Sequence, residues 1–157
     1  MLNRPVLLVG ALRGGSEQIQ GVEALLARDE VPDTTATRAH FLLGRAHYER
    51  REYADAMEQF KTVTRRTKSE TGARAQFFAG QVYQAQDDYK RAVVAYLRVI
   101  ALFGHYDQWV AAAKFESAKC HEALGHTAEA KNLYEDVVKH HKKTEWAAGA
   151  QERLAGM

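Results

Sequence analysis

The sequence is short of the residues that crosslink a chain. Of its 157 residues, only two are proline and one is cysteine. Cys120 has no second cysteine with which to form an intrachain disulfide, so oxidative crosslinking contributes nothing to the fold within one molecule. This shortage is compatible with the cytosol and equally with a bacterial periplasm. The localisation is therefore left unassigned.

Long apolar runs and an excess of one charge are also lacking. Apolar runs such as Val6 to Val9 are far shorter than the roughly 20 residues of a membrane-spanning helix. The segment 3–12 resembles a shortened signal peptide, but no Ala-x-Ala cleavage site follows it. The 22 Lys and Arg residues nearly balance the 20 Asp and Glu residues, whereas nucleic-acid binders concentrate positive charge. We therefore expect neither membrane insertion nor nucleic-acid binding, and whether Met1 is the natural start stays open.

Motifs for catalysis or metal binding are missing too. The segment from Gly10 to Ser16 has the outline of a phosphate-binding loop, but Gly15 occupies the position of the required lysine. None of the seven histidines belongs to a His-Glu-x-x-His motif or stands at a recognised ligand spacing. No order of Ser, His and acidic residues suggests a catalytic triad. The sequence thus predicts a protein that is not an enzyme, with no catalytic residue, no cofactor and no metal site.

What the chain does contain is an internal repeat. Residues 38–48 align with residues 74–84 and with residues 112–122, and a short polar break follows each segment. A second apolar stripe comes next at i, i+4 and i+7, which places its side chains on one face of a helix. The stripe consists of Ala56, Phe60 and Val63, then Ala92, Tyr96 and Val99, and then Ala130, Tyr134 and Val137.

Small residues recur where the two helices of each unit would cross. The first helices carry Gly44, Gly80 and Ala118 at one aligned position. Two helices approach closely only where the side chains at the contact are small, and the aromatic residue of the second stripe then fills the adjoining groove. His47 and His121 also occupy equivalent positions, and packing explains this better than metal binding.

These repeats resemble the tetratricopeptide repeat family. The matching residues are the pair Leu43-Gly44, the aromatic-type positions His47 and Tyr48, and the stripe that starts at Ala56. The proline that usually closes the family motif is missing from all three units, and the repeats of 36 and 38 residues resemble those of bacterial envelope-associated or magnetosome-type scaffolds. The resemblance implies an all-α fold, a right-handed superhelical solenoid of antiparallel helix pairs.

We interpret residues 1–157 as one domain of this type. Residues 3–36 form a degenerate first helix pair, in which Ser16 caps a helix that runs to Arg28. Three clear repeats follow, numbered 1 to 3 below, at residues 37–72, 73–110 and 111–147. Residues 148–157 form a final helix that caps the array.

The resemblance also implies that a ligand peptide lies on the concave face, which is lined by the first helices. One row on this face is phenylalanine, and the sequence is compatible both with an exposed row and with one that belongs to the core. Asparagine is missing from the aligned concave positions, so the resemblance does not imply the clamp for chaperone C-termini. The predicted ligand-binding residues are Arg38, Phe41, Arg45, Tyr48, Arg74, Phe77, Gln81, Gln84, Phe115, Lys119 and Glu122.

We therefore predict a non-catalytic scaffold or adaptor that binds a protein or peptide. Aromatic anchors flanked by Arg and Lys favour a segment with apolar and acidic character. One alternative is a scaffold that assembles with itself into homo-oligomers through stacking of its terminal repeats. Another is that the chain is the repeat arm of a longer envelope protein.

Overall fold

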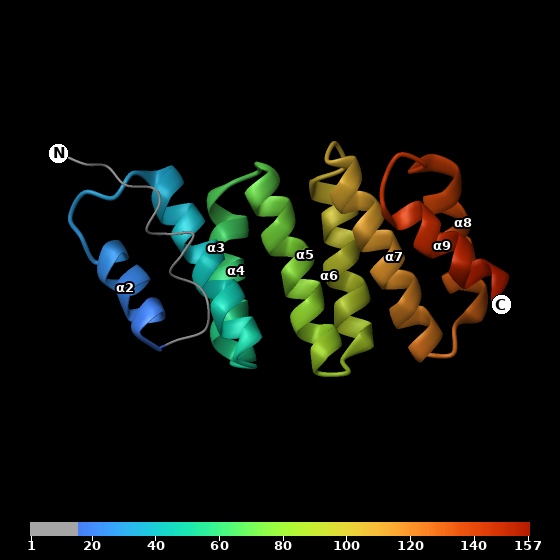
Figure 1. Cartoon of the computed structure of the whole chain (residues 1–157), viewed down its shortest axis with the longest axis horizontal. Coiled ribbons are helices and arrows are strands. Elements are labelled where there is room, and N and C mark those ends of the chain that lie inside the picture. Colours follow the sequence, from blue (N-terminus) through green and yellow to red (C-terminus); the bar gives the residue numbers. More distant parts are fainter. Residues whose placement is uncertain (1–15) are drawn as a thin grey trace. The chain divides into compact units, whose positions relative to one another are not determined.

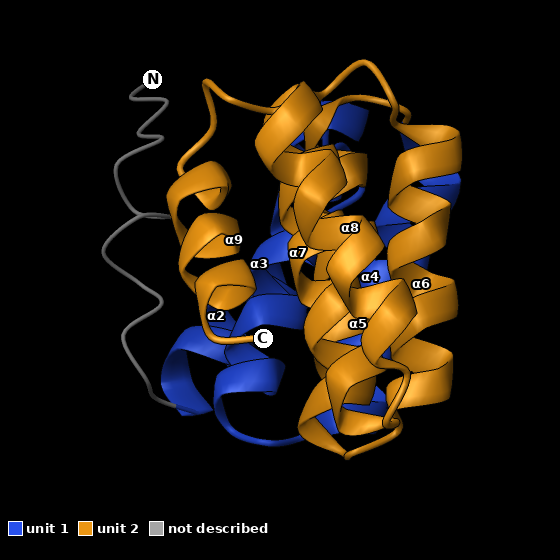
Figure 2. Ribbon diagram, turned by 90° about the vertical axis from the view of Figure 1, so that its right-hand side faces the viewer, with its two compact units in different colours: residues 1–67 blue, residues 68–157 orange. Residues whose placement is uncertain are grey.

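The computed structural model describes residues 16–157, and all the secondary structure in that range is helical. The chain divides into two compact units, Met1–Thr67 and Lys68–Met157, which Figure 2 shows in different colours. Unit 1 contains α2 (Ser16–Leu26), α3 (Asp33–Glu49) and α4 (Tyr53–Arg66). Unit 2 contains α5 (Glu70–Ala85), α6 (Tyr89–Leu102), α7 (Asp107–Ala123), α8 (Thr127–His140) and α9 (Trp146–Ala155).

The second helix of each repeat packs with the predicted stripe inward. All nine stripe residues on α4, α6 and α8 are fully buried. Phe60 lies against Gly44 in unit 1, and Tyr96 lies against Gly80 in unit 2, so closely that a Cβ on either glycine would overlap the ring. The close helix crossing that the sequence predicted from its small residues is therefore confirmed in both units.

The two helices of a repeat are joined by the same tight turn in all three repeats (Figure 1). The residues with positive φ at these turns are Arg51 at 62°, Asp87 at 57° and Gly125 at 76°. The amide of the following residue bonds to the carbonyl five positions back, from Glu52 to His47 in repeat 1. These bonds define a Schellman motif, which satisfies carbonyls left unpaired at the helix end.

Unit 2 has its first helices in one layer. Each helix from α5 to α9 contacts the next one along the chain, and α5 also contacts α7, as α7 contacts α9. This arrangement aligns the equivalent faces of α5, α7 and α9, so side chains from different repeats can meet on them.

The start of the chain lies in part outside the described residues. The first part of the predicted degenerate helix pair, residues 3–15, falls there, as does the phosphate-loop outline up to Gly15. From Ser16 onward a helix is present, and α2 buries Ile19 and Val22 against α3. It ends at Leu26, two residues before the predicted Arg28.

Candidate binding surface on the first helices

A chain of hydrogen bonds crosses from α5 to α7 on the first-helix layer of unit 2. The Gln81 amide donates to the hydroxyl of Tyr96 at 2.9 Å, and this hydroxyl donates to Gln84 Oε1 at 2.6 Å. The Gln84 amide nitrogen then donates to Glu116 Oε2 on α7 at 3.0 Å. Lys119 Nζ completes the chain with bonds of 3.1 and 2.9 Å to the two oxygens of Glu116. Three predicted ligand-binding residues thus belong to one connected network.

The same arrangement recurs one repeat further on, between α7 and α9. The hydroxyl of Tyr134 donates to Glu122 Oε2 at 3.0 Å, and Arg153 Nη1 of α9 lies 3.4 Å from the same oxygen. Burial and the hydrogen bond to Glu122 both raise the pKa of Tyr134, so its hydroxyl stays a donor. Tyr96 and Tyr134 occupy equivalent positions, as do Gln84 and Glu122. We call these two sets of hydrogen-bonded or ion-paired side chains together the polar network. Its members are Gln81, Gln84, Tyr96, Glu116 and Lys119 in the first set and Glu122, Tyr134 and Arg153 in the second.

The polar network balances its own charges. Glu116 is 7% exposed, and a carboxylate this deeply buried needs a cation and hydrogen bonds to remain charged. Lys119 and Gln84 provide them, while Glu122 has Arg153. The network therefore presents polar atoms with no excess of either charge.

Sequence reasoning missed four members of this network: Tyr96, Tyr134, Glu116 and Arg153. The sequence did carry a signal for the two tyrosines. Repeat 1 has phenylalanine at the same stripe position, and a buried tyrosine hydroxyl needs a partner that phenylalanine does not. Glu116 and Arg153 could not be assigned because each lies on the next first helix, where it pairs with Gln84 or with Glu122.

The phenylalanine row is largely core. Phe41 is 3% exposed and Phe77 is 6% exposed, while Phe115 is half-buried. In unit 2 a tryptophan at the start of the next first helix packs on each ring, with Phe77 and Trp109 centroids 5.5 Å apart and Phe115 and Trp146 centroids 5.4 Å apart. Of the two interpretations left open by the sequence, burial in the core is the one that fits Phe41 and Phe77.

Arg74, at the edge of this layer, packs beside the same tryptophan. Its guanidinium carbon lies 5.9 Å from the centre of the Trp109 ring, and the indole nitrogen of Trp109 donates to Glu70 at 3.0 Å. Stacking of a guanidinium on an indole is favourable and also fixes its direction. Arg74 therefore has a structural role within unit 2 in addition to the binding role predicted for it.

The predicted residues of unit 1 lie along α3. Arg38 is exposed, and Arg45 pairs with Glu49 one turn later at 3.0 Å. Tyr48 is half-buried, and its ring centre lies 6.2 Å from that of Tyr53 on α4. An exposed pair such as that of Arg45 and Glu49 contributes little to stability.

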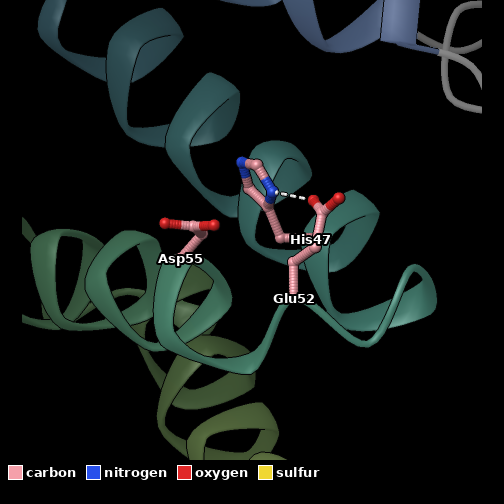
Figure 3. Close-up of side chains that lie close together, drawn as sticks. All are labelled: His47, Glu52 and Asp55. Atoms are coloured by element: carbon pink, nitrogen blue, oxygen red, sulfur yellow. Dashed lines mark hydrogen bonds and ion pairs between the residues drawn. The ribbon is translucent and has the colours of Figure 1, made fainter.

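Unit 1 also brings three possible metal ligands together (Figure 3). One nitrogen of His47 and one oxygen each of Glu52 and Asp55 lie within 4.8 Å of one another. His47 Nδ1 and Glu52 Oε2 are 2.7 Å apart, and Arg50 donates to Glu52 Oε1 at 2.8 Å. The hydrogen bond from His47 is the main cause that lowers the pKa of Glu52, with Arg50 adding to it. Sequence reasoning missed this group because its spacing matches no recognised motif.

Comparison with protein-family models assigns the repeat region of the sequence to one family. A profile described as tetratricopeptide repeat matches residues 22–70 and residues 41–112, and a second profile of the same description matches residues 112–144. Together they cover well over half of the chain. The chain belongs to the tetratricopeptide repeat family. Among curated proteins, no sequence matches it.

Solved structures share the fold of this tetratricopeptide repeat protein. Two crystal structures of MamA match with TM-scores of 0.61 and 0.57 at 22% and 19% identity, over 77% and 79% of the present chain and 65% and 66% of theirs. A Podosopora anserina protein, assigned as a kinesin light chain with nearly identical TPR-like repeats, matches with a TM-score of 0.68 at 21% identity. That match covers 88% of this chain and 74% of the other. The chain thus has the all-α helical-repeat solenoid fold predicted from its sequence.

The tetratricopeptide fold supports a protein-interaction scaffold in general. In the described part of the chain, no helix is both long and apolar enough to cross a membrane.

Burial raises the pKa of the Cys120 thiol to about 12, with the nearby Glu116 adding to the shift. The thiol is therefore protonated at neutral pH and is a poor nucleophile.

Proposed function

We propose that this tetratricopeptide repeat protein is a non-catalytic adaptor that binds a protein or peptide segment across its first helices. The observation that carries the proposal is the polar network, which recurs at equivalent positions in repeats 2 and 3. Gln81, Lys119 and Arg153 keep part of their side chains exposed along it. An extended segment laid across α5, α7 and α9 would meet one of these three side chains on each helix.

The chemistry of the network favours a segment with many hydrogen-bonding groups and little net charge. Lys119 and Arg153 are each paired with a glutamate, so an acidic ligand would have to compete with a carboxylate already in place. The Gln81 amide has a donor and an acceptor, as a peptide backbone does. For unit 2, this proposal replaces the acidic partner expected from the sequence with one of little net charge. For α3, which carries Arg38 and Arg45, we still propose a partner with apolar and acidic character.

A binding screen with matched variants tests the proposal. The variant Gln81→Ala/Lys119→Gln/Arg153→Ala removes the donors that would face a ligand, and it also takes from Glu116 and Glu122 their paired cations, so a loss of binding counts only where its melt is close to that of the wild type. Its control, Arg98→Ala/Lys131→Ala, removes exposed charges from the second helices α6 and α8. Both would be used beside the wild type on an array of extended peptides, with circular dichroism melts of all three proteins.

We expect the first variant to lose the peptides that the wild type retains, while the control keeps them. Each lost hydrogen bond to an uncharged ligand group should cost about 0.5–1.5 kcal/mol, and each bond from a charged donor somewhat more. Unchanged binding by the first variant, with normal helical signal, would refute a binding site on this surface of unit 2.

Self-assembly is a second candidate, and one observation favours it. The exposed face of α6 carries Val94, Leu97 and Leu102, each with half of its surface accessible. Neighbouring exposed aliphatic residues can mark an association surface. Sedimentation across a wide concentration range, with Val94→Lys/Leu97→Glu as the variant, would detect it. A wild-type oligomer that dissociates in the variant would support assembly. A wild type that stays monomeric at every concentration would exclude self-assembly.

The chain spans about two thirds of the MamA chains that it matches. Its role as the repeat arm of a longer envelope protein is therefore a further proposal, which the gene sequence around it would test. An open reading frame that extends beyond residues 1–157 would support it.

A further inference from the structure

Each Schellman turn joins the same two aligned positions of its repeat through a backbone hydrogen bond. The amide of Glu52 bonds to the carbonyl of His47 at 2.9 Å, and that of His126 bonds to the carbonyl of His121 at 2.8 Å. In this motif the two residues joined by such a bond also bring their side chains into contact, and the contact is commonly hydrophobic. Here it is polar in repeats 1 and 3, between His47 and Glu52 and between His121 and His126.

Repeat 1 places a third donor beside this pair (Figure 3). Asp55 lies in the first turn of α4, and its carboxylate is within 4.8 Å of ligand atoms of both His47 and Glu52. The His47 side chain is mostly buried, which restricts its rotation. Arg50 bonds to Glu52 through Oε1, so the other oxygen, Oε2, faces His47. The arrangement offers one imidazole nitrogen and two carboxylate oxygens to a common centre.

Repeat 3 places a second histidine at the position of Glu52. The Nδ1 atoms of His121 and His126 face each other at 3.4 Å. Metal–nitrogen bonds of about 2.0–2.1 Å at a tetrahedral angle put two nitrogen ligands roughly 3.3–3.4 Å apart. Glu129 stands at the position of Asp55 and acts on the charge of His121. Two imidazoles therefore meet at the turn that is equivalent to the one in repeat 1, and Glu129 lies in the first turn of the helix that follows.

Repeat 2 has the same backbone turn with different side chains. Tyr83 replaces the histidine, and the guanidinium carbon of Arg91, at the third position, lies 5.2 Å from the centre of the Tyr83 ring. Arg91 also bonds to Asp88. A cation of the protein itself thus occupies the place that a metal ion would take, and repeat 2 serves as an internal control.

We propose that the turns of repeats 1 and 3 each bind a divalent transition-metal ion through a histidine, the residue five positions later and the carboxylate at the next helix start. The ligand sets are His47, Glu52 and Asp55 in repeat 1, and His121, His126 and Glu129 in repeat 3. Imidazole nitrogen suits zinc, nickel or copper and not calcium or magnesium, which prefer all-oxygen sites. Three protein ligands leave positions for water or for a donor from a partner.

A titration of the full, untagged chain with zinc or nickel tests the proposal. The protein would first be dialysed against a chelator, and calorimetry would then give the stoichiometry. We expect two equivalents for the wild type, one for His47→Gln/Asp55→Asn and one for His121→Gln/His126→Gln. Replacement of Asp55 or Glu129 alone by its amide should weaken the metal affinity of the affected site at least roughly 10–100-fold. A loss of this size already follows when a residue that only hydrogen-bonds to a metal ligand is removed. Asp88→Asn in repeat 2 should change nothing.

Circular dichroism melts with and without metal give a second readout that does not depend on calorimetry. Metal that binds the folded chain raises the melting temperature, and each double variant should remove part of that rise. Two equivalents that persist in both double variants would place the ions elsewhere and overturn the proposal, as would an absence of binding in the wild type. If only one double variant binds less metal than the wild type, the proposal holds for the turn changed in that variant and is overturned for the other turn.

Discussion

Replacement of Gly80 by alanine should destabilise the protein, although alanine is the better helix former. Gly80 faces Tyr96, and an added Cβ would lie 2.7 Å from Cδ1 and 2.8 Å from Cζ of that ring. Real Cβ atoms do not come this close to another carbon, so either the ring or the helix must move. The ring is fully buried, and its hydroxyl is held by Gln81 and Gln84. A shift of Tyr96 would therefore also disturb the polar network.

The magnitude follows from two opposing effects. Overpacking of a close contact costs about 1–3 kcal/mol, while the change from glycine to alanine inside a helix gains about 1 kcal/mol. Because several ring atoms are involved and the ring has no free space, we place the cost in the upper half of its range. The free energy of unfolding should then fall by about 1–2 kcal/mol, which lowers the melting temperature by about 2–8 °C for a chain of this size.

Thermal melts followed by circular dichroism measure this effect, with Gly21→Ala as the matched control. Gly21 also lies inside a helix, but an added Cβ there has no atom within 4 Å, so the control should gain up to about 1 kcal/mol. Repeat 3 already has Ala118 beneath Tyr134, so an alanine is accepted where the ring is seated for it. If Gly80→Ala raised the melting temperature as much as Gly21→Ala, Tyr96 would be free to move and the argument would be refuted.

Three further predictions concern single groups. Gly125→Ala should lower stability by about 1–2 kcal/mol in the same melts, because its φ of 76° is left-handed although the space around it is open; no change would mean that the turn adapts. The thiol of Cys120, fully buried with a pKa raised to about 12, should react with a disulfide reagent only after denaturation; rapid labelling of the native protein would contradict this. Burial acts to raise the pKa of Asp136, but the hydrogen bond and charge of Lys114 outweigh it and hold the pKa below its ordinary value of 3.8. A lowered carboxyl pKa stabilises the fold above its unfolded value and loses this contribution as the pH falls through the folded value, so Asp136→Asn should flatten the fall of melting temperature between about pH 5 and pH 2; an unchanged slope would assign that fall to other groups.

The repeat fold could be predicted because its determinants recur within short windows of sequence. A helix crossing needs a small residue, and its partner stripe needs apolar residues at i, i+4 and i+7, so three copies of both identify helix pairs without any tertiary information. The starts of the first helices were less accessible. Helices α5 and α7 begin at Glu70 and Asp107, a few residues before the aligned segments, because these first turns differ in sequence between repeats.

The polar network was beyond sequence reasoning for a related reason. Which face of a first helix is exposed depends on what the next repeat places over it. Trp109 covers Phe77 from a helix more than thirty residues away along the chain, and nothing near Phe77 in the sequence indicates this. Glu116 is likewise bonded to Gln84, which lies on the preceding first helix and 32 residues away along the chain. Pairings between repeats have no fixed spacing signal, so a sequence alone predicts the rows of a surface but not their contacts.

The three turns show how one backbone carries different chemistry without a change of fold. The Schellman hydrogen bonds need only the main chain and one residue with positive φ, so the side chains at the two positions that the bond joins are free to vary. They are His47 and Glu52 in repeat 1, Tyr83 and Asp88 in repeat 2, and His121 and His126 in repeat 3. Substitution of these side chains should change what each turn binds more than it changes stability, whereas the buried stripes below them respond in the opposite way. Stability in this chain therefore rests on the buried positions that agree between repeats, and the chemistry of each turn on the two positions that differ.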